Sequence, residues 1–323
     1  MLTLSRNESL KYLILSIFAA MLLLLLVLVA PLQAGSVYYA APSSEGSGDC
    51  GSWSSACTLS TALLQASGSP GSEIWVLEGV HKPTTVITDR MATFFVPDGV
   101  AIYGGFAGWE SAREERDWEN NVTILSGDID GNDATNPAGV VTSTANITGT
   151  NSYHVLLGGA APYTAVLDGF TVTGGYADGT YSGWCDQACG GGMYNNNGQV
   201  SIDNVTFSGN YAIHTGGGMY NIYGSPIMSG TSFINNQSDQ GGGLALRRSA
   251  SVMTNTSFFG NEASKGGGIY VVESVGSTWS GYHTLMNVYV SGNRATSLGG
   301  GMYNSFGTVT LENSYFANNE AGQ

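Results

Sequence analysis

Three consecutive glycines occur five times in the second half of this chain, beginning at Gly190, Gly216, Gly241, Gly266 and Gly299. Successive triplets begin 25 or 26 residues apart, except for the last two, where a spacing of 33 fits one unit with a loop of seven residues. A period in this range is typical of a solenoid, in which each unit buries its apolar face only by stacking on its neighbours. The repeat therefore predicts an array of stacked turns over residues 190–323.

The residue types within each unit favour strands over helices. The segments are short, interrupted by glycine, and rich in Val, Ile, Thr, Tyr and Phe, which suit the pleated surface of a sheet. Helical repeats would need runs of helix formers, and the leucine and asparagine pattern of leucine-rich repeats is absent. We therefore predict an all-β fold, a single-stranded right-handed parallel β-helix whose equivalent residues stack over one another at about 4.8 Å per turn.

Equivalent positions in the units have predicted roles. Two apolar rows, one directly after each triplet and one 17 residues after the triplet begins (24 in the unit with the loop), are expected to form the core. An asparagine row is expected at a bend, where each amide bonds backbone or the asparagines of adjacent turns. A tyrosine row, interrupted at Ala245, is expected to point outward, either as simple stacking between turns or as a sugar-binding platform. The rows are Met193, Met219, Leu244, Ile269 and Met302; Phe207, Phe233, Phe258, Val290 and Phe316; Asn210, Asn236, Asn261, Asn293 and Asn319; and Tyr194, Tyr220, Tyr270 and Tyr303.

Residues 35–189 are predicted to form a cap and earlier, less regular turns of the same β-helix. Residues 58–66 begin with a threonine cap, continue with helix formers and are followed by Gly68 and Pro70, which predicts a short helix. Such a helix would cover the open end of the core, because the terminal turn of a solenoid lacks a neighbour. Residues 113–120 mix glutamates with Arg113 and Arg116 and are expected to form a solvated turn or short helix. Strand-like segments run over 74–80, 94–103, 122–125, 153–157 and 166–173.

Composition and cysteine usage indicate a protein outside the cytoplasm. Charged residues make up 11% of the chain and the formal net charge is −14. This acidity would repel phosphate backbones, so no nucleic-acid partner is expected. Cys50 with Cys57, and Cys185 with Cys189, are predicted to form local disulfides, because the Cys-x-x-Cys spacing and an adjacent histidine that zinc would need are missing. Such pairs oxidise in exported chains.

The first 34 residues predict export. Arg6 and Lys11 precede an apolar run from Tyr12 to Ala30, and Ala34 ends a context suited to signal peptidase. The run is also long enough to span a bilayer, so a cleaved signal peptide and an uncleaved anchor both stay open. In either case we expect residues from Gly35 onward to lie outside the cytoplasm, secreted or on the cell surface. Contact with a membrane is expected only through the uncleaved segment.

The most ligand-like group of residues follows Ser126. Asp128, Asp130, Asn132 and Asp133 surround Gly131 at alternating positions, as oxygen ligands do in the first part of an EF-hand calcium loop. The distal glutamate of a complete EF-hand is absent. The pattern therefore favours a metal-free Asp-Gly-Asn turn, and a weak calcium site at these four residues is the alternative. No other cofactor is expected, and none is required.

The sequence predicts no catalytic residues. Glycoside hydrolysis needs two carboxyl groups about 5 to 10 Å apart, and in the regular units Asp203 and Glu312 share a column but are four turns apart. The four histidines have no serine or cysteine partner in a recognisable motif. The irregular front half leaves open a site built from acidic residues there, namely Asp89, Asp98, Asp168 or Asp178.

The pairing of a Gly-Gly-Gly-[Met/Leu/Ile] strand with a Phe-x-x-Asn strand, over Gly190 to Asn319, resembles the repeats of polymorphic outer membrane proteins. The whole chain is similar to bacterial right-handed parallel β-helix proteins that carry such repeats. The resemblance implies a surface-exposed or secreted passenger for adhesion or envelope architecture, is compatible with association with the outer membrane, and does not imply an enzyme. The repeat places the start of another glycine triplet near Gln323. We therefore expect this chain to be a fragment or a truncated product of a longer protein.

Two functions are therefore weighed. The first is a non-catalytic adhesin or structural module, whose exposed side and loops at 176–189 and 274–283 meet a surface glycan or protein of a host or of the environment. The alternative is a polysaccharide-acting β-helix enzyme, a lyase or a glycoside hydrolase, which rests on analogy of fold.

Overall fold

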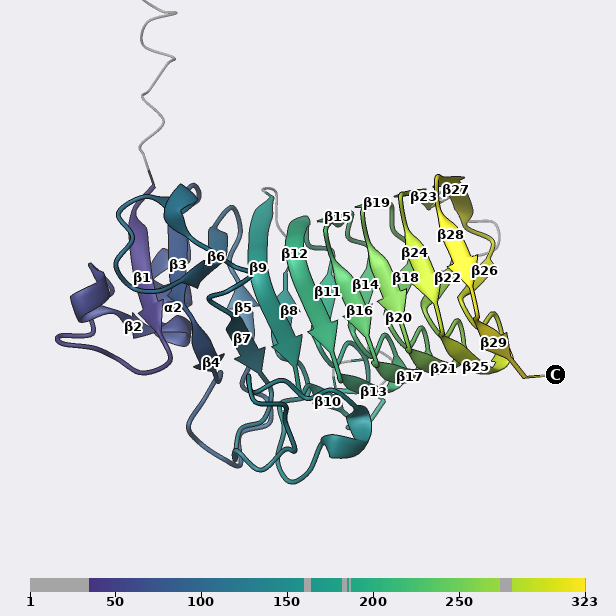
Figure 1. Ribbon diagram of the computed structural model, residues 1–323, viewed down its shortest axis with the longest axis horizontal. Coiled ribbons are helices and arrows are strands. Elements are labelled where there is room, and N and C mark those ends of the chain that lie inside the picture. Colours follow the sequence, from purple (N-terminus) through teal and green to yellow (C-terminus); the bar gives the residue numbers. More distant parts are fainter. Residues whose placement is uncertain (1–34, 160–163, 182–184, 186, 274–280, 323) are drawn as a thin grey trace, which may run out of the picture. The chain divides into compact units, whose positions relative to one another are not determined.

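The computed structural model describes residues 35–159, 164–181, 185, 187–273 and 281–322. Ser36–Gln323 form one compact unit, whereas the predicted signal peptide or anchor lies outside the described residues. Within this unit the chain winds through three sheets whose strands pair in parallel, and successive turns stack along one axis (Figure 1). The predicted all-β parallel β-helix with one capping helix is confirmed over the described part of the chain.

The first sheet has 16 strands. Its main row runs β2 (Cys57–Thr58), β1 (Val37–Ala41), β3 (Glu73–Leu77), β6 (Ala101–Phe106), β9 (Ala165–Thr173), β12 (Val200–Ser208), β15 (Ile227–Ser229), β19 (Ser251–Thr254), β23 (Tyr282–Met286) and β27 (Thr308–Glu312). Six further strands join it, namely β4 (Gly79–His81), β7 (Thr123–Ser126), β16 (Ser232–Ile234), β20 (Ser257–Phe259), β24 (Tyr289–Ser291) and β28 (Tyr315–Ala317).

The other two sheets have six and seven strands. The second contains β10 (Tyr176–Ala177), β13 (Tyr211–Thr215), β17 (Gln237–Gln240), β21 (Glu262–Lys265), β25 (Arg294–Leu298) and β29 (Glu320–Ala321). The third contains β26 (Met302–Ser305), β22 (Ile269–Val272), β18 (Leu244–Arg247), β14 (Met219–Ile222), β11 (Met193–Asn196), β8 (Leu156–Gly158) and β5 (Phe94–Val96). Single 3-10 turns occur at η1 (Trp53–Ser55), η2 (Arg113–Glu115) and η3 (Thr144–Asn146).

The two predicted core rows lie inside the β-helix and in register. Phe207, Phe233 and Phe258 are fully buried and pair strand to strand. Their rings stack with centroids 5.0 and 4.8 Å apart, which is the spacing of adjacent strands. The row that follows the triplets pairs in the same way from Met193 to Met302. One continuous apolar interior results, because each turn places the same residue type over its neighbour.

The glycine triplets join the second sheet to the third. Gly216 has φ +68°, a conformation that glycine adopts without strain. A Cβ atom at Gly217 or Gly218 would lie 2.6 Å from the carbonyl oxygen of the glycine one turn further on. Glycine therefore recurs at these positions because the backbones of stacked turns approach too closely for any side chain.

The helix α2 (Leu59–Ala66) covers the first turn, as predicted. Thr58 is its N-cap, and the side chain of Thr58 accepts a hydrogen bond from the Thr61 N–H. Leu59, Leu63 and Ala66 are buried, so the apolar face of the helix closes the end of the core that has no preceding turn.

Candidate functional site

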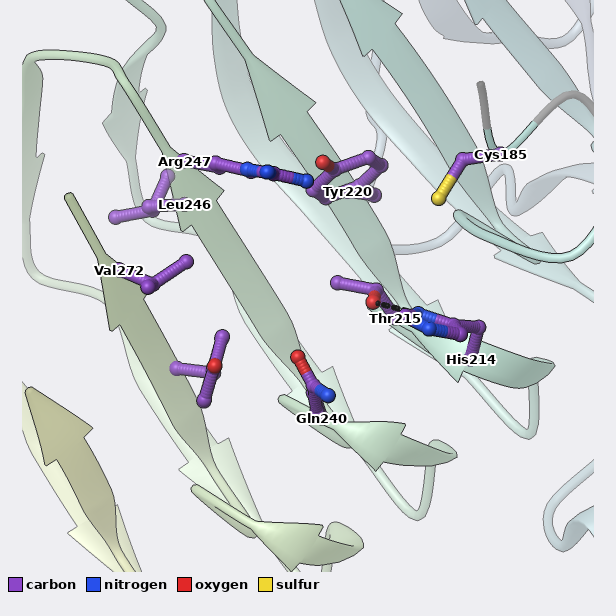
Figure 2. Close-up of a pocket in the computed structure, with 9 residues that line it drawn as sticks. Cys185, His214, Thr215, Tyr220, Gln240, Leu246, Arg247 and Val272 are labelled. Carbon is purple, nitrogen blue, oxygen red and sulfur yellow. Dashed lines mark hydrogen bonds between the residues drawn. The ribbon is translucent and has the colours of Figure 1, made fainter. Parts of the chain in front are cut away.

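A pocket of about 180 Å³ lies on the outer side of the β-helix, where the second and third sheets meet at the glycine bends (Figure 2). His214 and Thr215 of β13 and Gln240 of β17 line it from the second sheet. The third sheet contributes chiefly Tyr220, Arg247 and Tyr270, on β14, β18 and β22. Leu246, Val272 and Cys185 complete the lining.

Two members of the tyrosine row, Tyr220 and Tyr270, line this pocket. Tyr194 stacks on Tyr220 with centroids 5.8 Å apart, and Tyr270 stacks on Tyr303 at 5.4 Å. Ala245 pairs in register with Tyr220 on one side and Tyr270 on the other, so the pocket lies at the turn where the row lacks a ring. Tyr220 is only 2% exposed. Its side chain is therefore more buried than a sugar-binding platform on the surface would require.

These tyrosines and the second disulfide form a small apolar cluster outside the main core. Cys185 and Cys189 are bonded to each other, as are Cys50 and Cys57, which confirms both predicted pairings. Cys185, Cys189, Tyr194, Tyr220, Ala245 and Tyr270 pack together. The disulfide therefore secures a segment against the tyrosine row next to the pocket.

The structure corrects one expectation about these cysteines. His214 lies beside them, with a ring nitrogen and both sulfur atoms within 4.8 Å of one another, although no histidine is near in sequence. Both sulfur atoms are engaged in the disulfide, and metal coordination requires thiolates. The cluster therefore acts as a disulfide with a neighbouring imidazole.

Arg247 gives the pocket its charge. Among the described residues that line it, Arg247 is the one with a permanent positive charge. Burial lowers the pKa of His214, so this imidazole is neutral at pH 7, where it stacks under Tyr181 (4.4 Å) and bonds the Thr215 hydroxyl (2.6 Å). Burial raises the pKa of Tyr220, and a hydrogen bond from Arg247 opposes that rise. The pocket thus combines aromatic faces, hydrogen-bond donors and one cation.

The predicted calcium residues lie in one loop, and most of their oxygen atoms bond within the protein. Asp128 Oδ1 accepts from the N–H groups of Gly131 (2.7 Å) and Asn132 (3.1 Å). Asp133 accepts from the Thr148 N–H (2.7 Å) and from Asn151 Nδ2 (2.8 Å).

The loop nevertheless keeps features that suit a cation. Asp130 Oδ1 and Asn151 Oδ1 are buried and lack a hydrogen-bond partner. Burial, with the neighbouring charges of Asp128 and Asp130, raises the pKa of Asp133 to about 6. The hydrogen bonds above fit the favoured metal-free turn, and calcium binding stays an untested alternative.

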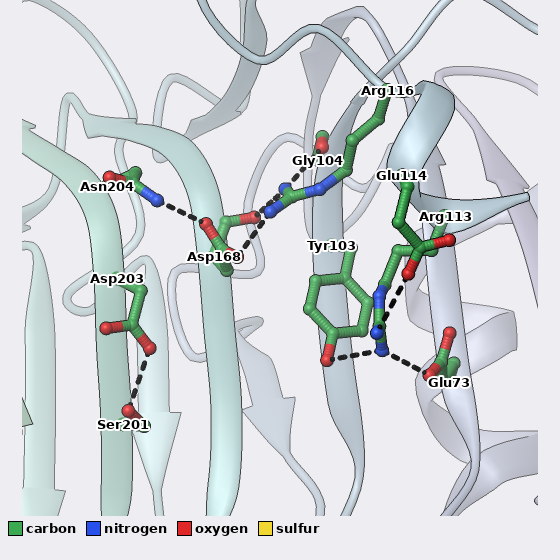
Figure 3. A network of polar contacts seen from close by, with 10 residues as sticks. All are labelled: Glu73, Tyr103, Gly104, Arg113, Glu114, Arg116, Asp168, Ser201, Asp203 and Asn204. Carbon is green, nitrogen blue, oxygen red and sulfur yellow. Dashed lines mark hydrogen bonds and ion pairs between the residues drawn. The ribbon is translucent and has the colours of Figure 1, made fainter.

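A second group of polar residues crosses the first sheet (Figure 3). Asp168 of β9 and Asp203 of β12 are register partners on neighbouring parallel strands. Arg116 forms an ion pair with Asp168, and the two side chains are only 13% and 14% exposed. Asn204 Nδ2 donates to the other carboxylate oxygen of Asp168 at 2.9 Å. Asp203 accepts from Ser201 Oγ (2.8 Å), and burial, with the charge of Asp168, raises the pKa of Asp203.

The segment 113–120 forms the expected short helical turn and is mostly exposed, but its two arginines are partly buried in this network. The single turn η2 does form, but Arg116 reaches across the sheet to Asp168. Arg113 donates to Glu73 (2.7 Å) and to the Tyr103 hydroxyl (3.2 Å). Of the other acidic candidates, Asp178 pairs with Arg90 at 2.6 Å. Sequence reasoning did not find this network because its members belong to the irregular turns, where no repeat gives the register.

A buried serine, histidine and glutamate also come together. Ser251 Oγ lies 2.9 Å from His283 Nδ1, and His283 Nε2 lies 3.7 Å from Glu273 Oε1. The expectation that the histidines lack a serine partner is therefore wrong for His283. His283 and Ser251 are 1% and 3% exposed, and burial lowers the pKa of His283 to about 4. A substrate cannot reach this serine, so the group is part of the interior.

The stacked turns, with rows of equivalent residues in register, define a β-helix repeat protein. A family model described as the Chlamydia polymorphic membrane protein repeat matches residues 255–272, which contain β20, β21 and β22. A comparison with curated proteins finds no match. Among solved structures, the crystal structure of Escherichia coli YbhC is similar at 14% identity and a TM-score of 0.38, covering 86% of this chain and 71% of that one. Within the described residues, no helix has both the length and the apolar character needed to cross a membrane.

Proposed function

We propose that this chain is a non-catalytic, secreted or surface-associated β-helix, an adhesin or envelope binding module that holds a glycan or protein of a host or environmental surface. The pocket beside Ala245 carries the proposal, because aromatic rings, hydrogen-bond donors and a cation converge there on a rigid set of strands. The match to a membrane-protein repeat supports surface association. The two disulfides support an oxidising compartment outside the cytoplasm.

The chemistry of the pocket favours binding over catalysis. No carboxyl group is among the described residues that line it, and Tyr220 has a raised pKa, which disfavours its use as a nucleophile or base at neutral pH. Tyrosine and arginine are the residue types that contribute most to binding interfaces. Their positions on stacked strands keep the site preorganised, which reduces the entropy lost on binding.

The test is the binding of the labelled full chain to a glycan array and to intact cells. We expect retained ligands, and we expect Arg247→Gln to weaken their binding at least fivefold. Arg294→Gln is the matched control, because it removes an equal charge from β25, which does not line this pocket. Ligands that bind the Arg247→Gln variant as well as the native chain would contradict a role for the pocket.

The enzyme alternative has support of its own in the paired carboxyl groups of Asp168 and Asp203. Neighbouring parallel strands lie about 4.8 Å apart, close to the roughly 5 to 5.5 Å between the carboxyl groups of retaining glycosidases. The raised pKa of Asp203 suits a general acid, and Arg116 compensates the charge of Asp168.

Release of reducing ends from polysaccharides would reveal such an activity. An enzyme is expected to lose it in Asp203→Asn and to keep it in Asp239→Asn, an exposed control on β17. Absence of release by the native chain across neutral and acidic polysaccharides would count against the enzyme and leave the binding module.

A further inference from the structure

We infer that an open pocket on the first sheet, beside Trp118, binds a neutral pyranose sugar of a surface glycan. The pocket has a volume of about 290 Å³ and lies between residues 118–123 and the strands β9 and β12. It is separate from the pocket beside Ala245, so the inference goes beyond the proposed function. Three observations carry it: an exposed tryptophan in a fixed position, a row of hydroxyl groups next to that tryptophan, and the charge of the lining.

Trp118 is held against the sheet by its own loop. The backbone N–H of Asp117 donates to the Gly105 carbonyl at 2.8 Å. A Cβ atom at Gly105 would lie 2.6 Å from Trp118 Cα, and one at Gly169 would lie 2.9 Å from Trp118 Cβ. Glycine at these two positions therefore lets the tryptophan lie directly on the backbone of the sheet, while 37% of Trp118 stays exposed. Tryptophan is among the residues that contribute most to binding, and a rigid one loses little entropy when a ligand arrives.

Hydroxyl groups lie next to Trp118 in the same pocket. Thr171 and Thr206 line it and are register partners on β9 and β12, about 4.8 Å apart as adjacent strands are. In the part of the chain that the structure describes, both threonine hydroxyls and the indole nitrogen of Trp118 lack a protein hydrogen-bond partner. Asn204 and Glu119 add an amide and a carboxylate to the lining. A pyranose suits this lining, because its C–H face can pack against an aromatic ring while its hydroxyl groups bond polar side chains.

The size and the surroundings of the pocket suit the end or the middle of a glycan chain. Pockets for drug-sized ligands usually have about 300 to 1,000 Å³, so this volume accommodates one or two sugar residues. The hydroxyl row continues beyond the pocket, since Ser232 pairs with Thr206 and Ser257 pairs with Ser232. A longer glycan can therefore follow the axis of the β-helix over these serines.

The charge of the lining selects a neutral sugar. Among the described residues that line the pocket, Glu119 is acidic and none is Lys, Arg or His. Arg116 lies next to Gly169 of the lining, but its charge is compensated by the ion pair with Asp168. Glu119 would repel an acidic sugar. A neutral sugar can instead donate hydroxyl hydrogen bonds to this carboxylate, which are stronger than bonds between neutral groups.

The experiment is an NMR titration of the isotope-labelled full chain with methyl β-glucoside, methyl β-galactoside and methyl β-glucuronide, observed at the indole N–H groups. We expect at least one neutral glycoside to shift the Trp118 signal with a Kd of about 1 mM, typical of a ligand with so few atoms. The glucuronide should bind at least fivefold more weakly. Glu119→Gln should reduce this difference, because it removes the repelling charge. Thr206→Val should weaken binding about two- to tenfold, the usual effect of losing one hydrogen bond.

Trp109→Ala is the matched control for Trp118→Ala. Trp109 is 69% exposed and is not among the residues that line this pocket, so its removal should leave the Kd unchanged, whereas Trp118→Ala should weaken binding at least tenfold. Equal losses in the two variants would contradict a site at Trp118. Circular dichroism and thermal unfolding establish whether Trp118→Ala folds, and if it does not, the Thr206→Val result decides.

Three other outcomes would overturn the inference: no binding of either neutral glycoside, a folded Trp118→Ala variant that binds as the native chain does, or a preference for the glucuronide. If neither neutral glycoside binds, but the labelled chain adheres to glycans or cells in a way that Arg247→Gln weakens, the Trp118 site is wrong and the proposed function stands. If the glycosides bind at Trp118 and Arg247→Gln changes nothing, the Trp118 site stands and the pocket beside Ala245 is wrong.

Discussion

The side-chain oxygen of Asn236 accepts hydrogen bonds from both the backbone N–H and the side-chain Nδ2 of Asn210, one turn away, each at 3.0 Å. Asn236 repeats the arrangement with Asn261 and also donates to the Phe207 carbonyl (2.9 Å). The same contacts continue through Asn293 to Asn319. This asparagine ladder satisfies buried backbone groups at a bend, where the strand hydrogen bonds are interrupted.

Asn236→Ala should lower the free energy of unfolding by about 4 kcal/mol, because several buried polar groups lose their partners at once. Asn319→Ala is the matched control at the last described turn. Asn319 is only half-buried, so water can replace its bonds and the expected loss is about 1 kcal/mol. Urea denaturation followed by circular dichroism measures both, and equal losses would contradict a role for the buried ladder.

Phe233→Ala should destabilise the fold by about 3 to 5 kcal/mol, the usual cost of removing a buried phenylalanine. The Phe233 ring is fully buried between Phe207 and Phe258, so the cavity cannot be filled by solvent. Phe316 holds the same position on the last turn but is 37% exposed, and Phe316→Ala should cost clearly less. Thermal and urea unfolding distinguish the two variants, and a larger loss at Phe316 would be inconsistent with a core that runs along the axis.

His81 should make the protein less stable as the pH falls below 6.5. Burial lowers the pKa of His81 to about 4 in the folded protein, whereas the unfolded chain titrates near 6.5. The folded state therefore binds fewer protons between these two values, and stability decreases with falling pH. From pH 7 to pH 5 this histidine should remove about 2 kcal/mol.

The measurement for His81 is the difference in unfolding free energy between the native chain and His81→Gln at both pH values. Glutamine can still donate to the Leu77 carbonyl, which lies 2.8 Å from His81 Nε2. The comparison cancels other groups, such as Asp133, whose raised pKa acts in the opposite direction in this range. A difference that does not change between pH 7 and pH 5 would show that His81 does not titrate as expected.

Calcium should raise the melting temperature if the loop at Asp128–Asp133 binds it. With a Kd of 10⁻⁴ to 10⁻³ M, typical of extracellular sites, 10 mM calcium would stabilise the fold by about 1.4 to 2.7 kcal/mol over a chelator. Asp130→Asn should abolish this gain, because Asp130 Oδ1 is buried without a partner. An unchanged melting temperature, or an equal effect of magnesium, would favour the metal-free turn.

The candidate site was only partly predictable from sequence. The tyrosine row and its interruption at Ala245 follow from the repeat, because equivalent residues are a fixed number of positions apart. The opposite wall does not, since the place of His214 and Gln240 depends on the angle between two sheets at the glycine bend. Similarly, Arg116 and Asp168 are 52 residues apart in the sequence, and no periodicity connects them.

The repeating interior of this protein follows from its amino-acid sequence alone. Units of 25 or 26 residues bury Phe233 and Met219, and give Asn236 its hydrogen-bond partners, only when equivalent residues of successive turns stack. The length of the repeat therefore sets the register between turns. The outer surface, including the side chains that meet at Arg247 and at Asp168, depends instead on the three-dimensional fold. Those contacts depend on bends and loops outside the repeat, where small differences in backbone direction, rather than hydrophobic burial, determine which residues become neighbours.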